Sequence, residues 1–271
     1  MQHPFDPFLC EMPHPDEDLR RLQAGFETYR EAEEEREFRI QALLRAASKK
    51  AICVADALAA CASNRRCLRP SCPVCMGRFR LWLGEQQLKL WPDDSDLRFW
   101  TLIPVSLAVG VDGLAQISPK QLRDMLRQQL SRAGVNGPVT GGIDGEYDQE
   151  RDVWQPHFHL IAPAASDAKI QGMVKRAYPP APGIYRPVVR LPVNDRPALF
   201  SYCLKSYWPE RVRFNADKGG RRSRHRRLQE GRHVAWLIWR HEFSLADFLF
   251  LSGVRRRGCH LLVGNRPTDT E

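Results

Sequence analysis

The sequence predicts an α+β fold, with a central antiparallel sheet, flanking helices and a helical N-terminal region ahead of the sheet. Three observations lead to this prediction. Residues 16–48 and 76–91 are rich in helix formers and contain no proline. From residue 97 onward, strand-like and helix-like segments follow the order β-α-β-β-α-β-α, which is typical of an antiparallel sheet with helices on one face. Four cysteines cluster between the two helix-rich segments, within residues 61–75.

The segments after residue 97 carry their own boundary signals. Ser118 as N-cap, Pro119 in the first turn and Gly134 as the stop define one helix. Two apolar runs joined through Gln149 and Glu150 predict a β-hairpin. The other expected elements are a strand over 97–105, hairpin strands over 138–148 and 151–163, a helix over 166–178, a strand over 184–193, a helix over 195–207 capped by Asn194 or Asp195, and a helix over 233–253.

The length and composition favour a large folded unit. A chain of 271 residues, 43% of them hydrophobic, suffices for one large domain or a catalytic domain with an appended module. We divide it into a helical N-terminal region over 1–92, with its Cys-rich part at about 53–78, a core over 93–210, and a basic loop with a C-terminal helical segment over 211–271. No apolar run approaches the roughly 20 residues of a membrane span, and no secretory signal is recognisable. We expect a cytoplasmic protein without a membrane partner or a disulfide framework.

The positive charge is unevenly distributed along the chain. The formal net charge is +9, and residues 211–232 carry nine lysines and arginines against Asp217 and Glu230. Such a run is often only a solvated loop. In a basic protein it favours a polyanion, because each phosphate contact releases counterions. The run has no wide apolar face for lipid, so it favours nucleic acid over a membrane surface.

Two histidines stand one residue apart in the apolar run VWQPHFHLIAP. In a strand, residues i and i+2 point to the same side, so His157 and His159 present their imidazoles together while Phe158 turns to the other face. A pair of satisfied histidines is about as compatible with this step as a metal site, and several reactions use such a pair. The surrounding motifs therefore have to decide between these interpretations.

A tyrosine and a lysine follow in the segment LFSYCLKSYW. On a helix over 195–207, Tyr202 and Lys205 share one face at i,i+3 spacing. A core tyrosine with a snorkelling lysine is the commoner meaning of this spacing. A phenol becomes a useful nucleophile when an ammonium stabilises its phenolate or a divalent ion activates the electrophile, and the upstream histidine pair favours that interpretation.

Three segments, in order, resemble the three motifs of HUH endonucleases, and in particular of rolling-circle replication initiator (Rep) proteins. They are the apolar strand RFWTLIPV, the strand PHFHLI and the helix with YCLK, and the resemblance covers about residues 97–210. The first segment reads TLIPVS where the family more often has a Thr-Leu-Thr pattern. The resemblance implies an HUH/ferredoxin-like, RRM-like core and a nickase and strand transferase that initiates rolling-circle replication of a plasmid or phage.

The resemblance also implies a role for each matched residue. His157 and His159 would bind Mg²⁺ or Mn²⁺, which polarises the scissile phosphate. Tyr202 would attack that phosphate, giving a 5′-phosphotyrosine link and a free 3′-OH, and Lys205 would assist electrostatically. Tyr207 is an alternative nucleophile, although on a continuous helix it lies well around from the Lys205 face.

A third metal ligand is expected, because two imidazoles alone make a weak site for a hard ion. Many family members take this ligand from a nearby acidic residue. Glu146 is the best candidate, and Asp144 lies two residues earlier on the same strand face. Glu146 is equally compatible with a solvated carboxylate of the hairpin.

The cysteine cluster reads CASNRRCLRPSCPVC and fits a tetrahedral four-thiolate zinc site. Cys53 is an alternative to the first ligand, because the first spacing is wide. Several Rep proteins have a similar Cys-rich knuckle before the first motif, and a closed site of this kind would be structural or position DNA. Cys10, Cys203 and Cys259 have no evident partner. The expected zinc ligands are Cys61, Cys67, Cys72 and Cys75.

The basic run after the tyrosine segment is expected to hold the backbone of origin DNA. The candidates for stacking on unpaired bases are Trp208, Trp236 and Trp239, although the i,i+3 spacing of Trp236 and Trp239 is more typical of a core. The arginines expected to contact DNA are Arg221, Arg222, Arg224, Arg226 and Arg227.

The partner implied by the resemblance is a single-stranded or cruciform DNA origin. The sequence has no G-x-x-x-x-G-K-[ST] loop, so a host helicase and polymerase are implied as further partners. Two alternatives remain open. One is a transposase of the same chemical class that acts on element ends. The other is a non-catalytic, zinc-containing DNA-binding regulator in which the histidine pair and tyrosine are structural.

Overall fold

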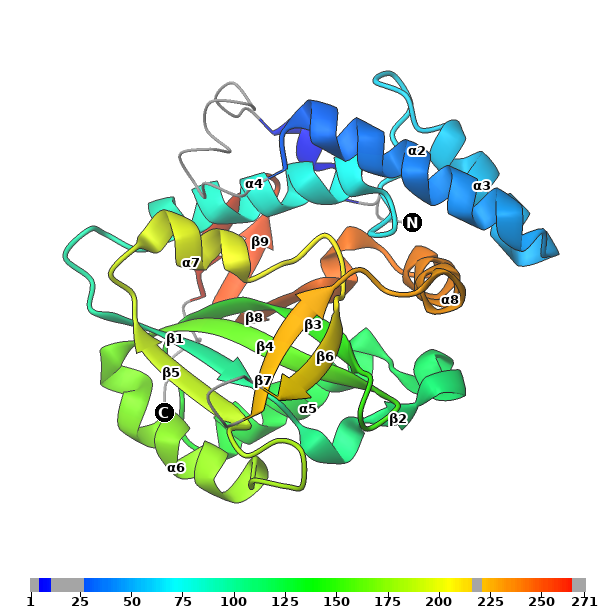
Figure 1. Ribbon diagram of the computed structural model, residues 1–271. Helices are drawn as coiled ribbons and strands as arrows, with labels where there is room; N and C mark the ends of the chain where they lie inside the picture. Colours follow the sequence, from blue (N-terminus) through cyan, green and yellow to red (C-terminus); the bar gives the residue numbers. More distant parts are fainter. Residues whose placement is uncertain (1–4, 11–26, 216–220, 265–271) are drawn as a thin grey trace.

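The structure is a computed structural model that describes residues 5–10, 27–215 and 221–264. One curled sheet forms its centre (Figure 1). A separate two-stranded hairpin follows near the C-terminus. The strands are β1 (Leu97–Leu102), β2 (Val109–Gly110), β3 (Val139–Asp148), β4 (Val153–Pro163), β5 (Val188–Pro192), β6 (Glu210–Asn215), β7 (Arg221–Arg226), β8 (Leu249–Ser252), β9 (Val254–Arg257) and β10 (His260–Val263).

The main path through the sheet has the order β5-β1-β4-β3-β6-β7, with β2 paired to β4 and β8 paired to β3. The neighbours β5-β1-β4-β3 are all antiparallel. The predicted α+β class is confirmed, but the sheet is mixed, because β3 and β6 run parallel. The predicted hairpin is also present as β3 and β4, which place the histidine-bearing strand in the middle of the sheet.

Several of the helices begin where a side chain accepts a hydrogen bond from one of the first free backbone N–H groups. Ser118 caps α5 as predicted, and of the two expected caps for α7, Asp195 accepts from the backbone of Ala198. The α-helices are α2 (Tyr29–Ala46), α3 (Lys49–Ala59), α4 (Pro73–Leu90), α5 (Pro119–Arg132), α6 (Asp167–Ala177), α7 (Arg196–Tyr202) and α8 (Glu230–His241). Short 3-10 helices are η1 (Pro7–Leu9), η2 (Val105–Leu107), η3 (Val111–Gln116), η4 (Ala164–Ser166) and η5 (Leu245–Phe248).

Helices cover both sides of the sheet. Figure 1 shows α4 and α7 on one side of the strands and α5 and α6 on the other. The prediction of helices on one face was therefore wrong. The reason is the burial of the central hairpin, since all of β3 is buried and so is β4 from Trp154 to Ala162. Strands buried on both faces need a covering layer on each side.

Two predicted helices are shorter than expected. The helix predicted over 195–207 ends at Tyr202, after which the chain turns so that the Pro209 carbonyl accepts from the Tyr147 backbone, 2.9 Å away. The helix predicted over 233–253 ends at His241, and β8 pairs with β3 instead of continuing it. In the first case the edge of β3 binds the backbone just beyond the predicted helix, and in the second it binds backbone that local propensity favoured as helix.

The basic segment is not a loop. Its described residues form the antiparallel pair β6 and β7, which extends the sheet beyond β3. The connection over 216–220, which includes Asp217, lies outside the described residues, and so do the side chains of Arg221 and Arg222.

A disulfide joins Cys10 to Cys259, with their Cα atoms 5.5 Å apart and 249 residues of sequence separation. The expectation that these two cysteines lack partners was therefore wrong, because the bond joins segments that only the fold brings together. Arg78 of α4 donates to the backbone carbonyl of Cys10 at 3.0 Å, and Trp82 donates to that of Cys259 at 2.8 Å. Helix α4 thus holds both ends of the bond.

Removing this bond should destabilise the protein. Cys10→Ser should lower the free energy of unfolding by about 2–5 kcal/mol, because the bond restricts a long loop of the unfolded chain. Urea denaturation with and without reductant measures this effect. Cys53→Ser, which changes an exposed cysteine of α3, is the control and should behave like the parent. A parent protein whose unfolding is insensitive to reductant would contradict the prediction.

Candidate metal centre and tyrosine pocket

One face of β3 and β4 gathers two imidazoles and a carboxylate. In the register of the hairpin, Asp144 lies opposite His157, and Gly142 lies opposite His159. The Asp144 Oδ2 atom is 3.2 Å from Nε2 of His159 and 3.4 Å from Nε2 of His157. The two histidines therefore share a face, as their period-two spacing predicts, and face a common carboxylate.

Thr101 of β1 orients one of these rings. It lies opposite His159 in the register, and its hydroxyl is 3.0 Å from Nδ1 of His159. A bond at Nδ1 leaves Nε2 directed at Asp144. This is the arrangement by which outer partners fix the tautomer of metal-binding histidines. The threonine belongs to the apolar strand β1, the predicted first motif.

Lys205 and Tyr202 reach the same face from the segment between β5 and β6. The Lys205 ammonium is 2.8 Å from Asp144 Oδ2 and lies 4.3 Å from the centre of the Tyr202 ring. The Tyr202 ring is in turn 4.8 Å from that of His159. The predicted proximity of Tyr202 and Lys205 is present, although Lys205 lies beyond the end of α7 and not on a helix face.

Gly142 of β3 allows this close approach, and Gly145, which alternates to the other face of the strand, makes room for the Trp208 ring. A Cβ at Gly142 would lie 2.2 Å from the Cys203 carbonyl oxygen, and one at Gly145 would lie 2.7 Å from the Trp208 ring. Since real Cβ atoms do not come so close to backbone oxygen, any side chain at Gly142 would push residues 203–208 away from the strand. The absence of a side chain at Gly142 thus sets the distance between the tyrosine-bearing segment and the histidines.

The charges of this centre are strongly coupled. Burial would raise the pKa of Asp144, but the Lys205 ammonium and hydrogen bonds from both imidazoles hold it well below its usual range. Burial would also lower the pKa of Lys205, and Asp144 and Tyr202 outweigh that effect and raise it. Burial lowers the pKa of His159 to about 3. Around neutral pH His159 is therefore an uncharged ring, the form that binds metal ions.

Asp144, His157 and His159 fit a metal ion. Their ligand atoms all lie within 4.8 Å of one another. Ligand atoms bound to a common ion at about 2.1 Å lie roughly 3 Å apart, close to the spacing between Asp144 Oδ2 and the two Nε2 atoms. Among the described residues, Oδ1 of Asp144 is buried without a hydrogen-bond partner, which leaves it available as a ligand.

Glu146 is engaged elsewhere. Its Oε1 atom is 3.0 Å from Nε of Arg211, and its Oε2 atom is 3.1 Å from Nε2 of His225. Burial would raise the pKa of Glu146, but His225 and Arg211 lower it. The structure thus brings Asp144, and not the first candidate Glu146, against the histidine pair.

A pocket of about 250 Å³ opens beside the centre. Tyr202, Lys205 and Tyr207 all line it. The expectation that Tyr207 lies around from Lys205 was therefore wrong, because α7 ends at Tyr202, before both of these residues. Arg80 of α4 is a buried cation in its wall, and it was not among the residues predicted for the site. We call this the tyrosine pocket; it is lined by Glu27, Arg80, Tyr202, Lys205, Ser206, Tyr207, Pro209 and His225.

The four predicted cysteines form a second cluster that could hold a metal ion. Three Sγ–Sγ distances are 3.6, 3.7 and 3.8 Å. A tetrahedron with metal–sulfur bonds of about 2.3 Å has edges of about 3.8 Å, so the thiols already have the spacing of a tetrahedral site. Cys53 is exposed on α3 and does not belong to the cluster, which consists of Cys61, Cys67, Cys72 and Cys75.

One buried arginine links this cluster to the tyrosine pocket. Arg39 of α2 is fully buried and donates to the Ser71 carbonyl at 2.8 Å and to the Ser206 carbonyl at 3.2 Å. Ser71 precedes Cys72, and Ser206 lies between Lys205 and Tyr207. A single guanidinium therefore holds the backbone of both centres.

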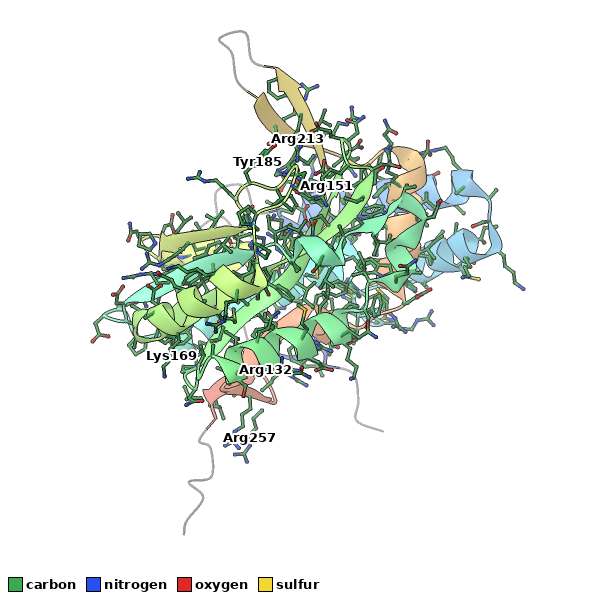
Figure 2. The ribbon with its side chains drawn as sticks, turned by 90° about the horizontal axis from the view of Figure 1, so that it is seen from below. Arg132, Arg151, Lys169, Tyr185, Arg213 and Arg257 are labelled. Atoms are coloured by element: carbon green, nitrogen blue, oxygen red, sulfur yellow. A yellow bond between two sulfur atoms is a disulfide. The ribbon has the colours of Figure 1, made fainter. Side chains whose placement is uncertain are left out.

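The predicted DNA-binding arginines have different surroundings. Arg226 pairs with the buried carboxylate of Glu210 at 3.0 Å, and Arg227 pairs with Glu35 at 2.7 Å. Arg224 is exposed on β7. Near the base of this hairpin, the view from below in Figure 2 places further arginines, Arg151 and Arg213, near the exposed Tyr185.

All three candidate tryptophans are buried. Trp236 and Trp239 belong to the core, as their spacing predicts. Trp208, the candidate for base stacking, is also buried, against Gly145 of β3.

Comparisons with protein-family models, curated protein sequences and solved structures gave no match to this chain. Among the described residues, no helix is both long and apolar enough to cross a membrane. The features from which a function can be inferred are therefore the two centres and the surfaces beside them.

The cysteine cluster should bind one metal ion. Cys72→Ser should remove one equivalent of bound metal and destabilise the fold, since metal binding at such a site contributes directly to folding. Elemental analysis of purified protein, combined with thermal unfolding, measures both effects. Cys53→Ser should keep the full metal content, and an unchanged metal content in Cys72→Ser would contradict the assignment.

The Asp144 carboxylate should be essential to stability. Asp144→Asn keeps the shape but leaves the Lys205 ammonium buried without a counter-charge, so the free energy of unfolding should fall by about 3 kcal/mol. Urea denaturation measures the change. The double variant Asp144→Asn/Lys205→Met should recover most of the loss, because it removes both charges.

The control for this prediction is Asp124→Asn. Asp124 pairs with Lys120 at the exposed surface of α5, where loss of the charge should have no measurable effect. The prediction fails if Asp144→Asn is as stable as the parent, or if the double variant is less stable than the single one.

Proposed function

We propose that this chain is a metal-dependent endonuclease that nicks and rejoins single-stranded DNA through a 5′-phosphotyrosine intermediate. The observation that carries the proposal is the meeting of Tyr202 and Lys205 with Asp144, His157 and His159 at one buried centre beside an open pocket. The resemblance to HUH endonucleases matches these residues, except for the third ligand, which is Asp144. The antiparallel strands β5-β1-β4-β3, with the histidines on a central strand, are compatible with the HUH core.

The reaction would proceed by in-line attack at phosphorus. The Tyr202 oxygen forms a bond to the phosphorus, the bond from phosphorus to the 3′-oxygen breaks, and the phenol proton is lost as the leaving oxygen becomes a 3′-OH. Lys205 stabilises the negative charge that develops on the phenolate, because its ammonium lies against the Tyr202 ring. The phosphotyrosine bond keeps the energy of the phosphodiester, so the reverse reaction rejoins the strand.

Asp144, His157 and His159 would hold Mg²⁺ or Mn²⁺, and two imidazoles beside one carboxylate suit Mn²⁺ better than the oxygen-preferring Mg²⁺. A divalent ion there would act as a Lewis acid on a non-bridging oxygen of the scissile phosphate. Thr101 positions His159 for this task through its contact at Nδ1. The four cysteines would hold Zn²⁺ in a closed site, with a structural role.

The tyrosine pocket would receive the scissile phosphate. Lys205, Arg80 and His225 line it, so a phosphate beside the tyrosines lies among side chains that carry or can accept positive charge. Burial lowers the pKa of the Arg80 guanidinium, while the nearby carboxylates of Glu27 and Asp144 oppose that shift. The basic hairpin β6–β7 would hold the flanking DNA backbone through exposed residues such as Arg224.

The wider role would be the initiation of rolling-circle replication of a plasmid or phage, with a host helicase and polymerase extending the free 3′-OH. This role rests on the family resemblance. A transposase would use the same chemistry at element ends, and the identity of the DNA that is cut distinguishes the two.

Tyr202→Phe should abolish covalent attachment to single-stranded DNA from the adjacent replicon, because the nucleophilic oxygen is gone. The measurement is the mobility of a protein–oligonucleotide adduct on a denaturing gel, with and without chelator. Binding of the uncut strand should be largely unchanged, since the aromatic ring remains.

Tyr207→Phe is the matched control and should retain the adduct. An adduct that persists in Tyr202→Phe and disappears in Tyr207→Phe would assign the nucleophile to Tyr207. Absence of any adduct with the parent protein, in the presence of Mn²⁺ and of replicon DNA, would overturn the proposed function.

A further inference from the structure

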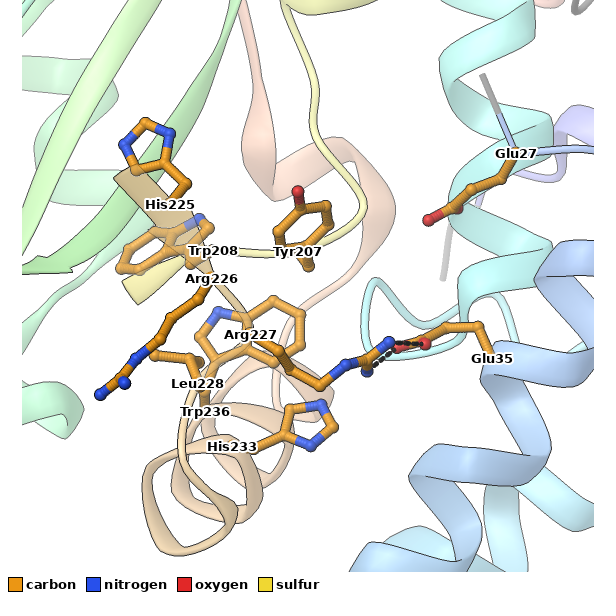
Figure 3. Close-up of a pocket in the computed structure, with 10 residues that line it drawn as sticks. All are labelled: Glu27, Glu35, Tyr207, Trp208, His225, Arg226, Arg227, Leu228, His233 and Trp236. Atoms are coloured by element: carbon orange, nitrogen blue, oxygen red, sulfur yellow. Dashed lines mark hydrogen bonds and ion pairs between the residues drawn. The ribbon is translucent and has the colours of Figure 1, made fainter. Parts of the chain in front are cut away.

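A second pocket, of about 320 Å³, adjoins the tyrosine pocket (Figure 3). The two pockets share Glu27, Tyr207 and His225 as wall residues, so a ligand in one reaches the edge of the other. We call the second one the aromatic pocket; it is lined by Glu27, Glu35, Tyr207, Trp208, His225, Arg226, Arg227, Leu228, His233 and Trp236.

The walls of the aromatic pocket are largely flat rings. Tyr207 is 46% exposed, whereas Trp208 and Trp236 are buried and fixed by the core. Figure 3 shows Tyr207 beside Trp236, with the Glu27 carboxylate directed toward Tyr207 from the opposite side. Rigid aromatic walls with one accessible ring favour a planar ligand, such as a base taken out of its stack.

The charges in the pocket argue against a phosphate there. Arg226 and Arg227, its two arginines, are paired with the carboxylates of Glu210 and Glu35. The lysine that could neutralise a phosphate lies in the tyrosine pocket instead. A nucleotide chain that places its phosphate beside Tyr202 would therefore place an uncharged group, the base, in the aromatic pocket.

Unused polar atoms define which base fits. Glu27 accepts from the Ser206 hydroxyl through Oε1 at 3.0 Å, and its Oε2 atom is buried with no hydrogen-bond partner in the described part of the chain. The Nε1 atoms of Trp208 and Trp236 are likewise buried and unpaired among the described residues. A carboxylate oxygen accepts from an exocyclic amino group such as N4 of cytosine.

We propose that the aromatic pocket holds a single unstacked nucleobase with an exocyclic amino group, read by Glu27 and stacked on Tyr207. This base neighbours the phosphate that the tyrosine pocket receives, so the inference rests on the proposed function. Glu27 is then a specificity-determining residue, and Tyr207 provides a stacking surface for the base.

The test is the binding of labelled 12-residue oligo(dC) and oligo(dT), measured by fluorescence anisotropy with the full chain. Homopolymers place the same base in every register, and the two pyrimidines differ mainly in the amino group. The parent should bind oligo(dC) about tenfold more tightly than oligo(dT), the value of one well-formed base contact. Glu27→Gln should reduce this ratio to about twofold or less.

Glu230→Gln is the matched control. It makes the same chemical change at a carboxylate that pairs with Arg45 on the exposed surface, and it should keep the parent ratio. Tyr207→Leu should weaken binding of both oligonucleotides about tenfold, whereas Tyr207→Phe should not, because only the first removes the ring. This second pair keeps the test decisive if Glu27→Gln does not fold.

Equal affinity of the parent for both homopolymers would overturn the inference, as would a ratio that survives in Glu27→Gln or tight binding by Tyr207→Leu. These outcomes are separate from the fate of the proposed function. Adducts at Tyr202 without a base preference would support the proposed nuclease activity and contradict the proposed base pocket. A Glu27-dependent base preference without any adduct would support the base pocket and contradict the nuclease activity.

Discussion

The arrangement of the site depends on one buried carboxylate. Asp144 is 1% exposed in the middle of β3, and its Oδ2 atom faces two imidazoles from β4 and the ammonium of Lys205. A buried charge is tolerated only when it is paired and hydrogen-bonded, so the carboxylate and these three groups determine one another's positions. Gly142 permits the remaining approach, because only a residue without a side chain leaves room for the backbone of residue 203.

Local sequence patterns predicted those parts of the site whose residues are close together in the sequence. The alternation of a strand places His157 and His159 on one face, and four cysteines in 15 residues come together as a cluster. The third ligand needed more than this. The alternation of side chains along a strand puts Asp144 and Glu146 on the same face. The choice between them depends on Arg211 of β6 and His225 of β7, which bind Glu146.

Long-range contacts explain what the sequence could not predict. The segment after Tyr202 has helical propensity, but the Cys203 carbonyl packs on Gly142 of β3 and the Pro209 carbonyl accepts from the Tyr147 backbone, so the helix stops. The same turn brings Tyr207 into the pocket of Tyr202. Arg80 and the bond between Cys10 and Cys259 have no local signal either, because each meets its neighbours through residues far away in the chain.

Arg39 has a consequence for how the chain unfolds. The predicted boundary at residue 92 would separate the cysteine cluster from the core, yet Arg39 bonds the carbonyl of Ser71 on one side of it and that of Ser206 on the other. Opening either side exposes the same buried guanidinium. The two parts are thus expected to share one cooperative unfolding unit, in which amide protons near Ser71 and Ser206 exchange with a common free energy.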